Sequence, residues 1–151
     1  MEKKDENRTL RISRNFKASV SQIWNALTNP EAIAAWWGPK GFSTTVQHMD
    51  VRKGGEWRLI LHGPDGTNYP NRSVYLEIVP HQKIVFEHFN PHFITTLHFT
   101  GKGQESCVDW SMLFDSEEQY ATIVTAHKAD QGLFENMQKL EHYLAQLQNS
   151  I

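Results

Sequence analysis

Regularly spaced turn residues across the middle of the chain constrain its fold more than any other feature. Between residues 41 and 115, clusters rich in Gly, Pro, Asn and Asp separate segments of about eight to eleven residues. Some segments alternate apolar with polar side chains, as in Trp57-Arg58-Leu59. Segments of this length joined by short turns are typical of antiparallel strands. The region predicts six strands, and residues 8–17 predict a further strand before it.

Two short helices are predicted between the first strand and the other six. Ser19 and Gln22 form a capping-box pattern, which satisfies free amides at a helix start. Apolar residues at positions 20, 23, 24 and 27 give this helix one apolar face. Asn29-Pro30 predicts the start of a second helix. Because Trp36 and Trp37 are adjacent near its end, only one of them can face the core. The other is expected either at a cavity mouth or a partner interface, or simply as a partly exposed ring.

A long helix is predicted at the C-terminal end of the chain. Ser116 and Gln119 repeat the capping-box pattern, and apolar residues then recur at helical spacing as far as Leu147. About 30 residues of continuous helix would measure roughly 45 Å. Gly132 in the middle of this stretch predicts either a bend or a neighbour too close for a side chain.

One long helix cannot fill the concave side of a curled seven-stranded sheet. A helix is only about 10 Å wide, so either large side chains fill the remaining space or a cavity remains there. The chain is rich in large side chains, because aromatic residues make up 11% of it and include five Trp and eight Phe. These rings are expected either to plug the gap or to line it.

Several short motifs occur in order along the chain, among them Asn29-Pro30-Glu31, Trp36-Trp37-Gly38-Pro39, Asp50-Val51-Arg52, Gly54-Gly55, Trp57-Arg58 and Tyr75-Leu76-Glu77-Ile78-Val79-Pro80. Together they resemble the heat-shock-protein-ATPase-activator-like family of the SRPBCC superfamily, over residues 8–147. The resemblance implies an α+β helix-grip fold: a curved antiparallel sheet of about seven strands wrapped around a long C-terminal helix, with two short helices after the first strand. We expect a single domain over residues 1–151, with residues 1–7 flexible.

Composition argues against several classes of protein. A formal net charge of −2 argues against nucleic-acid binding, which needs a basic excess. A single Cys excludes an internal disulfide and a cysteine-based zinc site. The charged start shows no signal-peptide pattern, and no apolar run reaches the roughly 18 residues of a membrane span. We therefore expect a cytoplasmic protein that binds neither nucleic acid nor membrane.

The sequence contains no motif for a cofactor, a metal or nucleophilic catalysis. No P-loop or dinucleotide-binding glycine pattern occurs, and Cys107 lacks a nucleophile-elbow context. His88 and His92 invite a metal-binding interpretation, but the sequence marks no complete set of three or four ligands. Glu77, within an otherwise apolar strand, and His88 are the candidates for acid–base chemistry.

The favoured hypothesis is binding of a small apolar or aromatic molecule in a cavity between the sheet and the C-terminal helix. Two alternatives stay open: a protein-interaction module that modulates a heat-shock ATPase, and an enzyme that uses Glu77 or His88 as acid or base. Binding is favoured over catalysis, and a homodimer stays open. The predicted cavity wall consists of Trp37, His48, Trp57, Leu59, Glu77, Phe86, His88, Trp110, Met112, His127, Phe134 and Met137.

Overall fold

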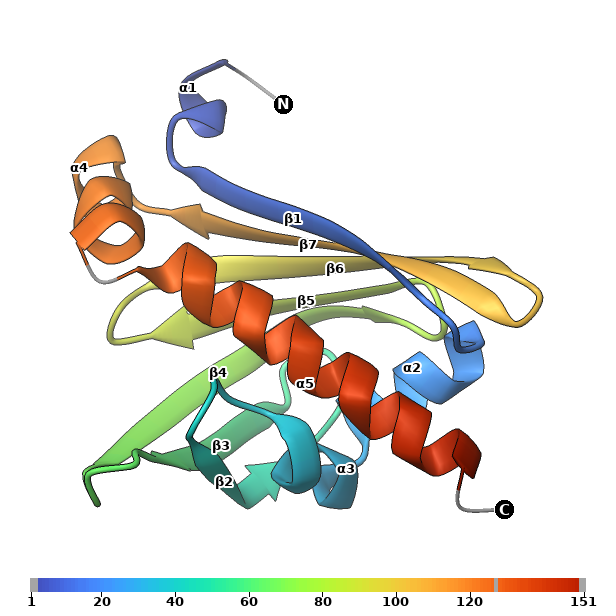
Figure 1. Ribbon diagram of the computed structural model, residues 1–151. Coiled ribbons are helices and arrows are strands. Elements are labelled where there is room, and N and C mark those ends of the chain that lie inside the picture. The colour runs from blue at the N-terminus through green and yellow to red at the C-terminus, as the bar shows by residue number, and fades with distance from the viewer. Residues whose placement is uncertain (1–2, 127, 150–151) are drawn as a thin grey trace.

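The computed structural model of the protein describes residues 3–126 and 128–149. Seven strands form one antiparallel sheet, with helices before, between and after them (Figure 1). The strands are β1 (Thr9–Phe16), β2 (Ser43–Met49), β3 (Glu56–His62), β4 (Asn68–Val79), β5 (Lys83–Phe89), β6 (Phe93–Lys102) and β7 (Glu105–Phe114). The helical elements are α1 (Lys3–Glu6), α2 (Val20–Thr28), α3 (Pro30–Trp36), α4 (Glu117–Tyr120), the π-helical turn η1 (Ala121–Ala126) and α5 (Ala129–Asn149). Within the described residues, none of the helices has both the length and the hydropathy that crossing a membrane requires.

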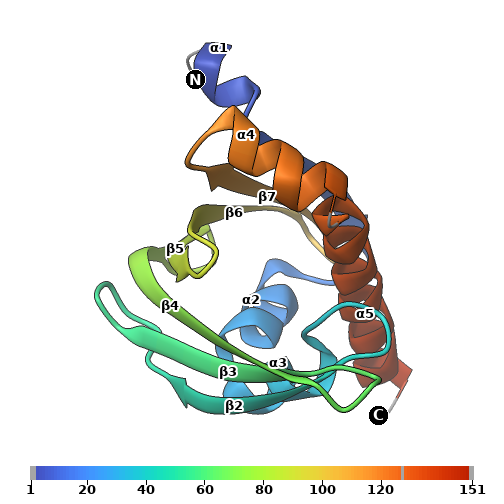
Figure 2. The same cartoon turned by 90° about the vertical axis from the view of Figure 1, so that its left-hand side faces the viewer.

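The sheet curls around one side of α5. Its strand order is β1-β7-β6-β5-β4-β3-β2, so β1 and β2 lie at opposite edges, and the α2–α3 pair connects these two edges. In a view turned by 90°, the strands trace an arc whose open side faces α5 (Figure 2). This arrangement confirms the predicted α+β helix-grip fold, including the two short helices after the first strand.

The two short helices begin at the predicted residues. Ser19 Oγ accepts a hydrogen bond from Gln22 N at 3.2 Å, and Gln22 Oε1 accepts one from Ser19 N at 2.9 Å. This reciprocal pair is the predicted capping box, and it satisfies two amides that the helix leaves free. Asn29 Oδ1 accepts from Glu31 N at 2.9 Å at the start of α3, and Pro30 occupies the first helical position, where no amide donor is needed.

The C-terminal region differs from the single long helix that the sequence predicts. α4 begins at the predicted cap, where Ser116 Oγ accepts from Gln119 N at 3.0 Å, but η1 follows after only four residues. Lys128, with a φ of 57°, separates η1 from α5. A residue in the left-handed region cannot continue a right-handed helix. The break therefore falls at Lys128 rather than at Gly132, where an added Cβ would meet no atom within 4 Å.

The core lies between the concave face of the sheet and α5 from Met137 onward, where α2 also packs. Met137, Leu140 and Leu144 on α5 are almost fully buried there. Burying a side chain of this size stabilises the fold by about 1.5–3 kcal/mol. Trp36 is buried as well, and its Nε1 donates to Ala26 O at 2.8 Å. Of the two adjacent indoles, Trp36 therefore belongs to the core.

Candidate functional site

A cavity of about 170 Å³ lies between the concave face of the sheet and the N-terminal half of α5. Its wall comes from β3 to β7, from the loop after α3 and from the first two turns of α5. No Asp, Glu, Lys or Arg of the described residues contributes to this wall. The lining residues are Trp37, Gly38, Pro39, Trp57, Leu59, Leu61, Asn71, Ser73, Phe86, His88, Phe93, Thr95, Trp110, Met112, Ala129, Gly132, Leu133 and Asn136.

Three indole rings form much of the apolar wall. Trp37 directly follows α3, and its ring stacks on that of Trp110 from β7, with centroids 5.6 Å apart. The Trp37 ring also meets Trp57 of β3 edge-on at 5.0 Å. Phe86 of β5 approaches Trp57 from another direction at 5.3 Å. Aromatic pairs favour stacked and edge-on contacts at about 4.5–7 Å, so the rings hold one another in place.

His88 brings a polar group to the same wall. Its Nδ1 donates to Pro91 O at 2.8 Å, its Nε2 lies 2.6 Å from Asn71 Oδ1, and its ring stacks on Phe93 at 4.4 Å. Two carbonyl oxygens around one imidazole favour the protonated ring, but burial opposes protonation. Burial prevails and lowers the pKa of His88 below its usual value, with a smaller lowering from the nearby His92. A neutral imidazole donates from one nitrogen only, so the hydrogen bond to Pro91 O leaves Nε2 without a proton, facing the side-chain amide of Asn71. Acid–base work at Nε2 would require a ligand to displace Asn71.

The first two turns of α5 close the cavity opposite the sheet. Ala129, Gly132, Leu133 and Asn136 follow the spacing of one helix face. The missing side chain of Gly132 leaves open space at this face, since a Cβ there would have no neighbour within 4 Å. Asn136 Oδ1 accepts from Gly38 N at 3.0 Å and so ties the loop after α3 to the helix. The two layers are therefore joined at the rim of the cavity.

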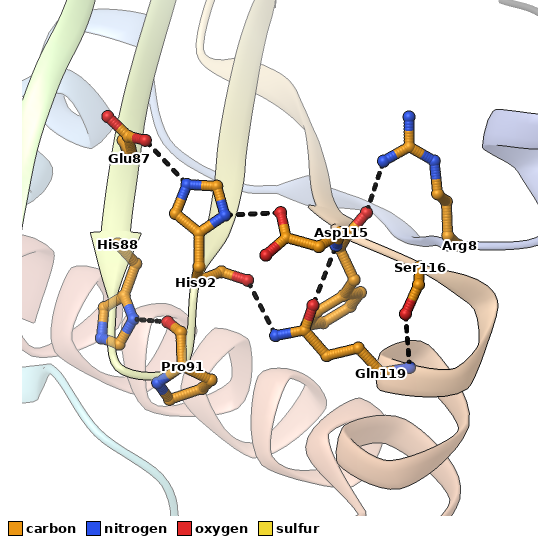
Figure 3. A network of polar contacts seen from close by, with 9 residues as sticks. Arg8, Glu87, His88, Pro91, His92, Asp115, Ser116 and Gln119 are labelled. Atoms are coloured by element: carbon orange, nitrogen blue, oxygen red, sulfur yellow. Dashed lines mark hydrogen bonds and ion pairs between the residues drawn. The ribbon is translucent and has the colours of Figure 1, made fainter.

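A polar network anchors the turn that positions His88 (Figure 3). His92 lies between two carboxylates, with Nε2 2.7 Å from Glu87 Oε2 and Nδ1 2.6 Å from Asp115 Oδ1. Hydrogen bonds to Glu87 and then to Asp115 raise the pKa of His92 above its usual value. Gln119 Nε2 donates to His92 O at 3.1 Å, and Gln119 Oε1 accepts from Asp115 N at 2.9 Å. The β5–β6 turn is thereby fastened to the start of α4.

The two histidines of this turn do not converge on a common site. His88 lines the cavity, whereas His92 is held between carboxylates outside the cavity wall. Among the described residues, no group of three or more His, Cys, Asp or Glu side chains is arranged to hold a metal ion. The spacing of His88 and His92 in the sequence therefore reflects the ends of a tight hairpin.

Two predicted wall residues, His48 and Glu77, lie outside the cavity, and each follows a β-bulge. The register shifts between Val46 and His48 in β2, and between Tyr75 and Glu77 in β4. An extra residue in a strand reverses the alternation of its side chains, so both residues turn to the outer surface. Glu77 is exposed there and forms an ion pair with Lys83 at 3.0 Å. The placement of His48 and Glu77 in the wall is therefore wrong, and with it the hypothesis that Glu77 acts on a cavity-bound ligand.

Two predicted residues of α5 lie on other parts of the helix. Phe134 is 48% exposed, with the guanidinium of Arg14 5.4 Å from its ring centroid. It follows Leu133 directly, and one residue turns a helix by about 100°, so Phe134 points away from the cavity. Met137 is fully buried in the core and does not reach the wall. His127 lies outside the described residues, so its predicted place stays untested.

The remaining predicted residues come together on the wall: Trp37, Trp57, Leu59, Phe86, His88, Trp110 and Met112. Leu61, Ser73 and Thr95 were missed, although each continues the alternation of an inward-facing strand and could have been found by that signal. Gly38 and Asn136 carry no such signal, because their positions depend on contact between a loop and a distant helix.

The curved antiparallel sheet, the two short helices after its first strand and the long C-terminal helix define a helix-grip protein. More specifically, the family described as Activator of Hsp90 ATPase homolog 1-like protein matches residues 17–148, and the chain belongs to this family. It is part of the SRPBCC superfamily that the sequence motifs resemble.

Solved structures of bacterial proteins show the same fold. A crystal structure from Nitrosomonas europaea superposes with a TM-score of 0.88 at 20% identity, covering 96% of this chain and 99% of that chain. A solution structure from Arthrobacter aurescens superposes with a TM-score of 0.88 at 20% identity, covering 96% of this chain and 90% of that chain. The AHSA1 protein from Silicibacter pomeroyi superposes with a TM-score of 0.73 at 16% identity, covering 91% of this chain and 97% of that chain. At such identities the likeness shows the fold alone. No curated protein matches this chain significantly.

Proposed function

We propose that the protein binds a small apolar or aromatic molecule in the cavity between the sheet and α5. The open volume of about 170 Å³ beside three indole rings is the observation that carries this proposal. The wall is lined mainly by aromatic and aliphatic side chains. A ligand that fills the space removes apolar surface of the wall from water, which stabilises the complex by roughly 25 cal/mol for each Å² buried.

The cavity volume sets the size of the ligand. An engineered apolar cavity of roughly 150 Å³ in another protein accommodates benzene, so a volume of about 170 Å³ suits one aromatic ring with small substituents. Drug-sized pockets begin at about 300 Å³, which argues against a large polycyclic ligand. The rings of Trp37, Trp110 and Phe86 offer both faces and edges for aromatic contact.

Thermal unfolding and tryptophan fluorescence test this proposal with a panel of substituted benzenes. A ligand at about 100 times its Kd stabilises the folded state by about 2.7 kcal/mol, which should raise Tm by about 5–10 °C in a domain of this size. Binding should also change the emission of Trp37, Trp57 and Trp110, because these rings line the cavity.

A pair of variants on α5 makes the test specific to the cavity. Gly132→Leu places a side chain into the open space at the wall and should abolish binding. Gln138→Leu introduces the same side chain on the exposed face of the same helix and should leave binding intact. Equal binding by both variants, or no binding by the unaltered protein across the panel, would refute the proposal.

The family match favours a second candidate, an interaction module that modulates a heat-shock ATPase. On this alternative, the protein should change the rate of ATP hydrolysis by Hsp90, and Gly132→Leu should leave that change intact. An unaltered rate at saturating concentration would reject it. Both candidates fit the cytoplasmic location that the sequence predicts.

A further inference from the structure

Two residues with hydroxyl groups line the cavity, one on β4 and one on β6. Ser73 on β4 is 4% exposed, Thr95 on β6 is 1% exposed, and both belong to the cavity wall. Neither hydroxyl forms a hydrogen bond with any other described residue. Neither oxygen belongs to the fully enclosed polar atoms that lack a partner, so both are accessible from the cavity, and a hydroxyl can donate a hydrogen bond to a molecule there.

Asn136 adds a donor from the opposite side of the cavity. It is 7% exposed, and its Oδ1 already accepts from Gly38 N. Its Nδ2 has no partner among the described residues, and an amide nitrogen can only donate. Asn71 differs, because its Oδ1 lies against His88 and its Nδ2 donates to Tyr69 O at 3.0 Å.

The wall as a whole is short of hydrogen-bond acceptors. The acceptor oxygens of Asn71 and Asn136 are already engaged, with His88 and with Gly38 N, and no carboxylate of the described residues lines the cavity. The indole N–H groups of Trp57 and Trp110 also lack an acceptor among the described residues, but they are fully enclosed and do not open into the cavity. The two hydroxyls and Asn136 Nδ2 can all donate, so a ligand with an acceptor oxygen matches them.

Among the described residues, the cavity wall also lacks a charge that could balance an anion. No Lys or Arg of these residues contributes to the wall. His88 is the one titratable group that they bring to it, and burial lowers its pKa, which disfavours the charged ring. A carboxylate in this wall would be desolvated without a partner, which is strongly unfavourable.

We propose that the ligand is an uncharged single-ring aromatic molecule with an acceptor oxygen, such as an aryl ketone, which accepts a hydrogen bond from Ser73 or Thr95. This inference rests on the proposed function and narrows its ligand class. β4 and β6 flank β5, and neighbouring strands lie about 4.8 Å apart, so their backbones are about 10 Å apart. A single acceptor oxygen of the ligand can therefore bond to one of the two hydroxyl groups, but not to both.

The test compares acetophenone with α-methylstyrene, which has the same planar shape with a CH₂ group in place of the carbonyl oxygen. Calorimetry gives both Kd values for the unaltered protein and for the double variant Ser73→Ala, Thr95→Val. Loss of the hydrogen bond should weaken ketone binding about tenfold, while α-methylstyrene binds the variant at least as tightly. Thr96→Val, the next residue on β6 and outside the cavity wall, is the matched control and should change neither Kd.

The outcomes separate this inference from the proposed function. If neither neutral compound binds the unaltered protein, the proposed function fails for single-ring ligands. If both compounds bind but the double variant changes the two Kd values by the same factor, the acceptor contact is refuted while the cavity remains a binding site. Benzoate should bind at least tenfold more weakly than acetophenone, and equal or tighter binding would overturn the requirement for an uncharged ligand. The double variant should melt at or above the temperature of the unaltered protein, because it loses only unpaired hydroxyls.

Discussion

The two halves of α5 face the same concave sheet but fill the space in front of it differently. In the C-terminal half, Leu140 and Leu144 are almost fully buried in the core. In the N-terminal half, Gly132 and Asn136 occupy the corresponding face and line a cavity. The helix passes across the sheet in both halves (Figure 2). The comparison teaches that the cavity depends on small and polar residues at a few helix positions, where a larger apolar residue would close it.

The largest expected effect comes from the packed half. Leu140→Ala should lower the free energy of unfolding by about 2–5 kcal/mol, because it removes a fully buried side chain and leaves a void. Denaturant unfolding measures this change. Leu147→Ala, at a position that is 38% exposed, is the control and should cost much less. Similar losses in both variants would contradict the difference between the core and the rest of the helix.

A smaller loss is expected at the boundary between the two halves. Asn136→Ala should lower the free energy of unfolding by about 1–3 kcal/mol, because it leaves the buried N–H of Gly38 without an acceptor. Hydrogen exchange should also become faster in the loop after α3, which this bond holds to the helix. Gln138→Ala on the exposed face serves as the control, and unchanged exchange in the loop would show that Asn136 does not hold it.

In the half of α5 that lines the cavity, one substitution should raise stability and weaken ligand binding. Gly132→Ala should raise the free energy of unfolding by about 1 kcal/mol, because Ala favours a helix and a Cβ there meets no atom within 4 Å. The same methyl group reduces the cavity and should weaken ligand binding several-fold. Chemical denaturation and ligand titration measure the two effects. A variant that gains both stability and affinity would contradict the role of Gly132 as open wall.

The smallest effect concerns the turn beside the cavity. Hydrogen bonds to Glu87 and Asp115 raise the folded pKa of His92 above its unfolded value of about 6.5. Their stabilisation is therefore fully present below that value and is lost as pH rises through the folded pKa. His92→Gln should lower the free energy of unfolding by less than about 1 kcal/mol at pH 5.5, and by less still at pH 9. A loss of unfolding free energy in His92→Gln that grows with pH would contradict the raised pKa of His92.

The order of elements and much of the cavity wall could be predicted from local sequence patterns. Trp57 and Leu59 share a strand face by simple alternation, as do Trp110 and Met112, and the structure places all four on the wall. The prediction of these four residues is correct because paired strands in register keep the alternation of side chains, and burial of one face of the sheet enforces that alternation.

The differences between the predicted and the observed structure arise where the backbone departs from the regular period of a strand or a helix. A bulge in β2 turned His48 outward, and a bulge in β4 did the same to Glu77. The helix break at Lys128 has no Gly or Pro to mark it, since a residue with a side chain adopts the left-handed conformation there. Such departures are decided by tertiary packing, which a local pattern does not contain.

The strand order has a consequence for how the chain assembles. β2 to β7 form a meander in which each strand pairs with its neighbour in sequence, whereas β1 pairs with β7. Thr9 lies opposite Leu113, and Phe16 lies opposite Ser106, so this pairing closes a loop of roughly a hundred residues, an entropic cost that slows folding. During synthesis on the ribosome, the first strand to emerge must therefore wait for the last one before the sheet can be completed.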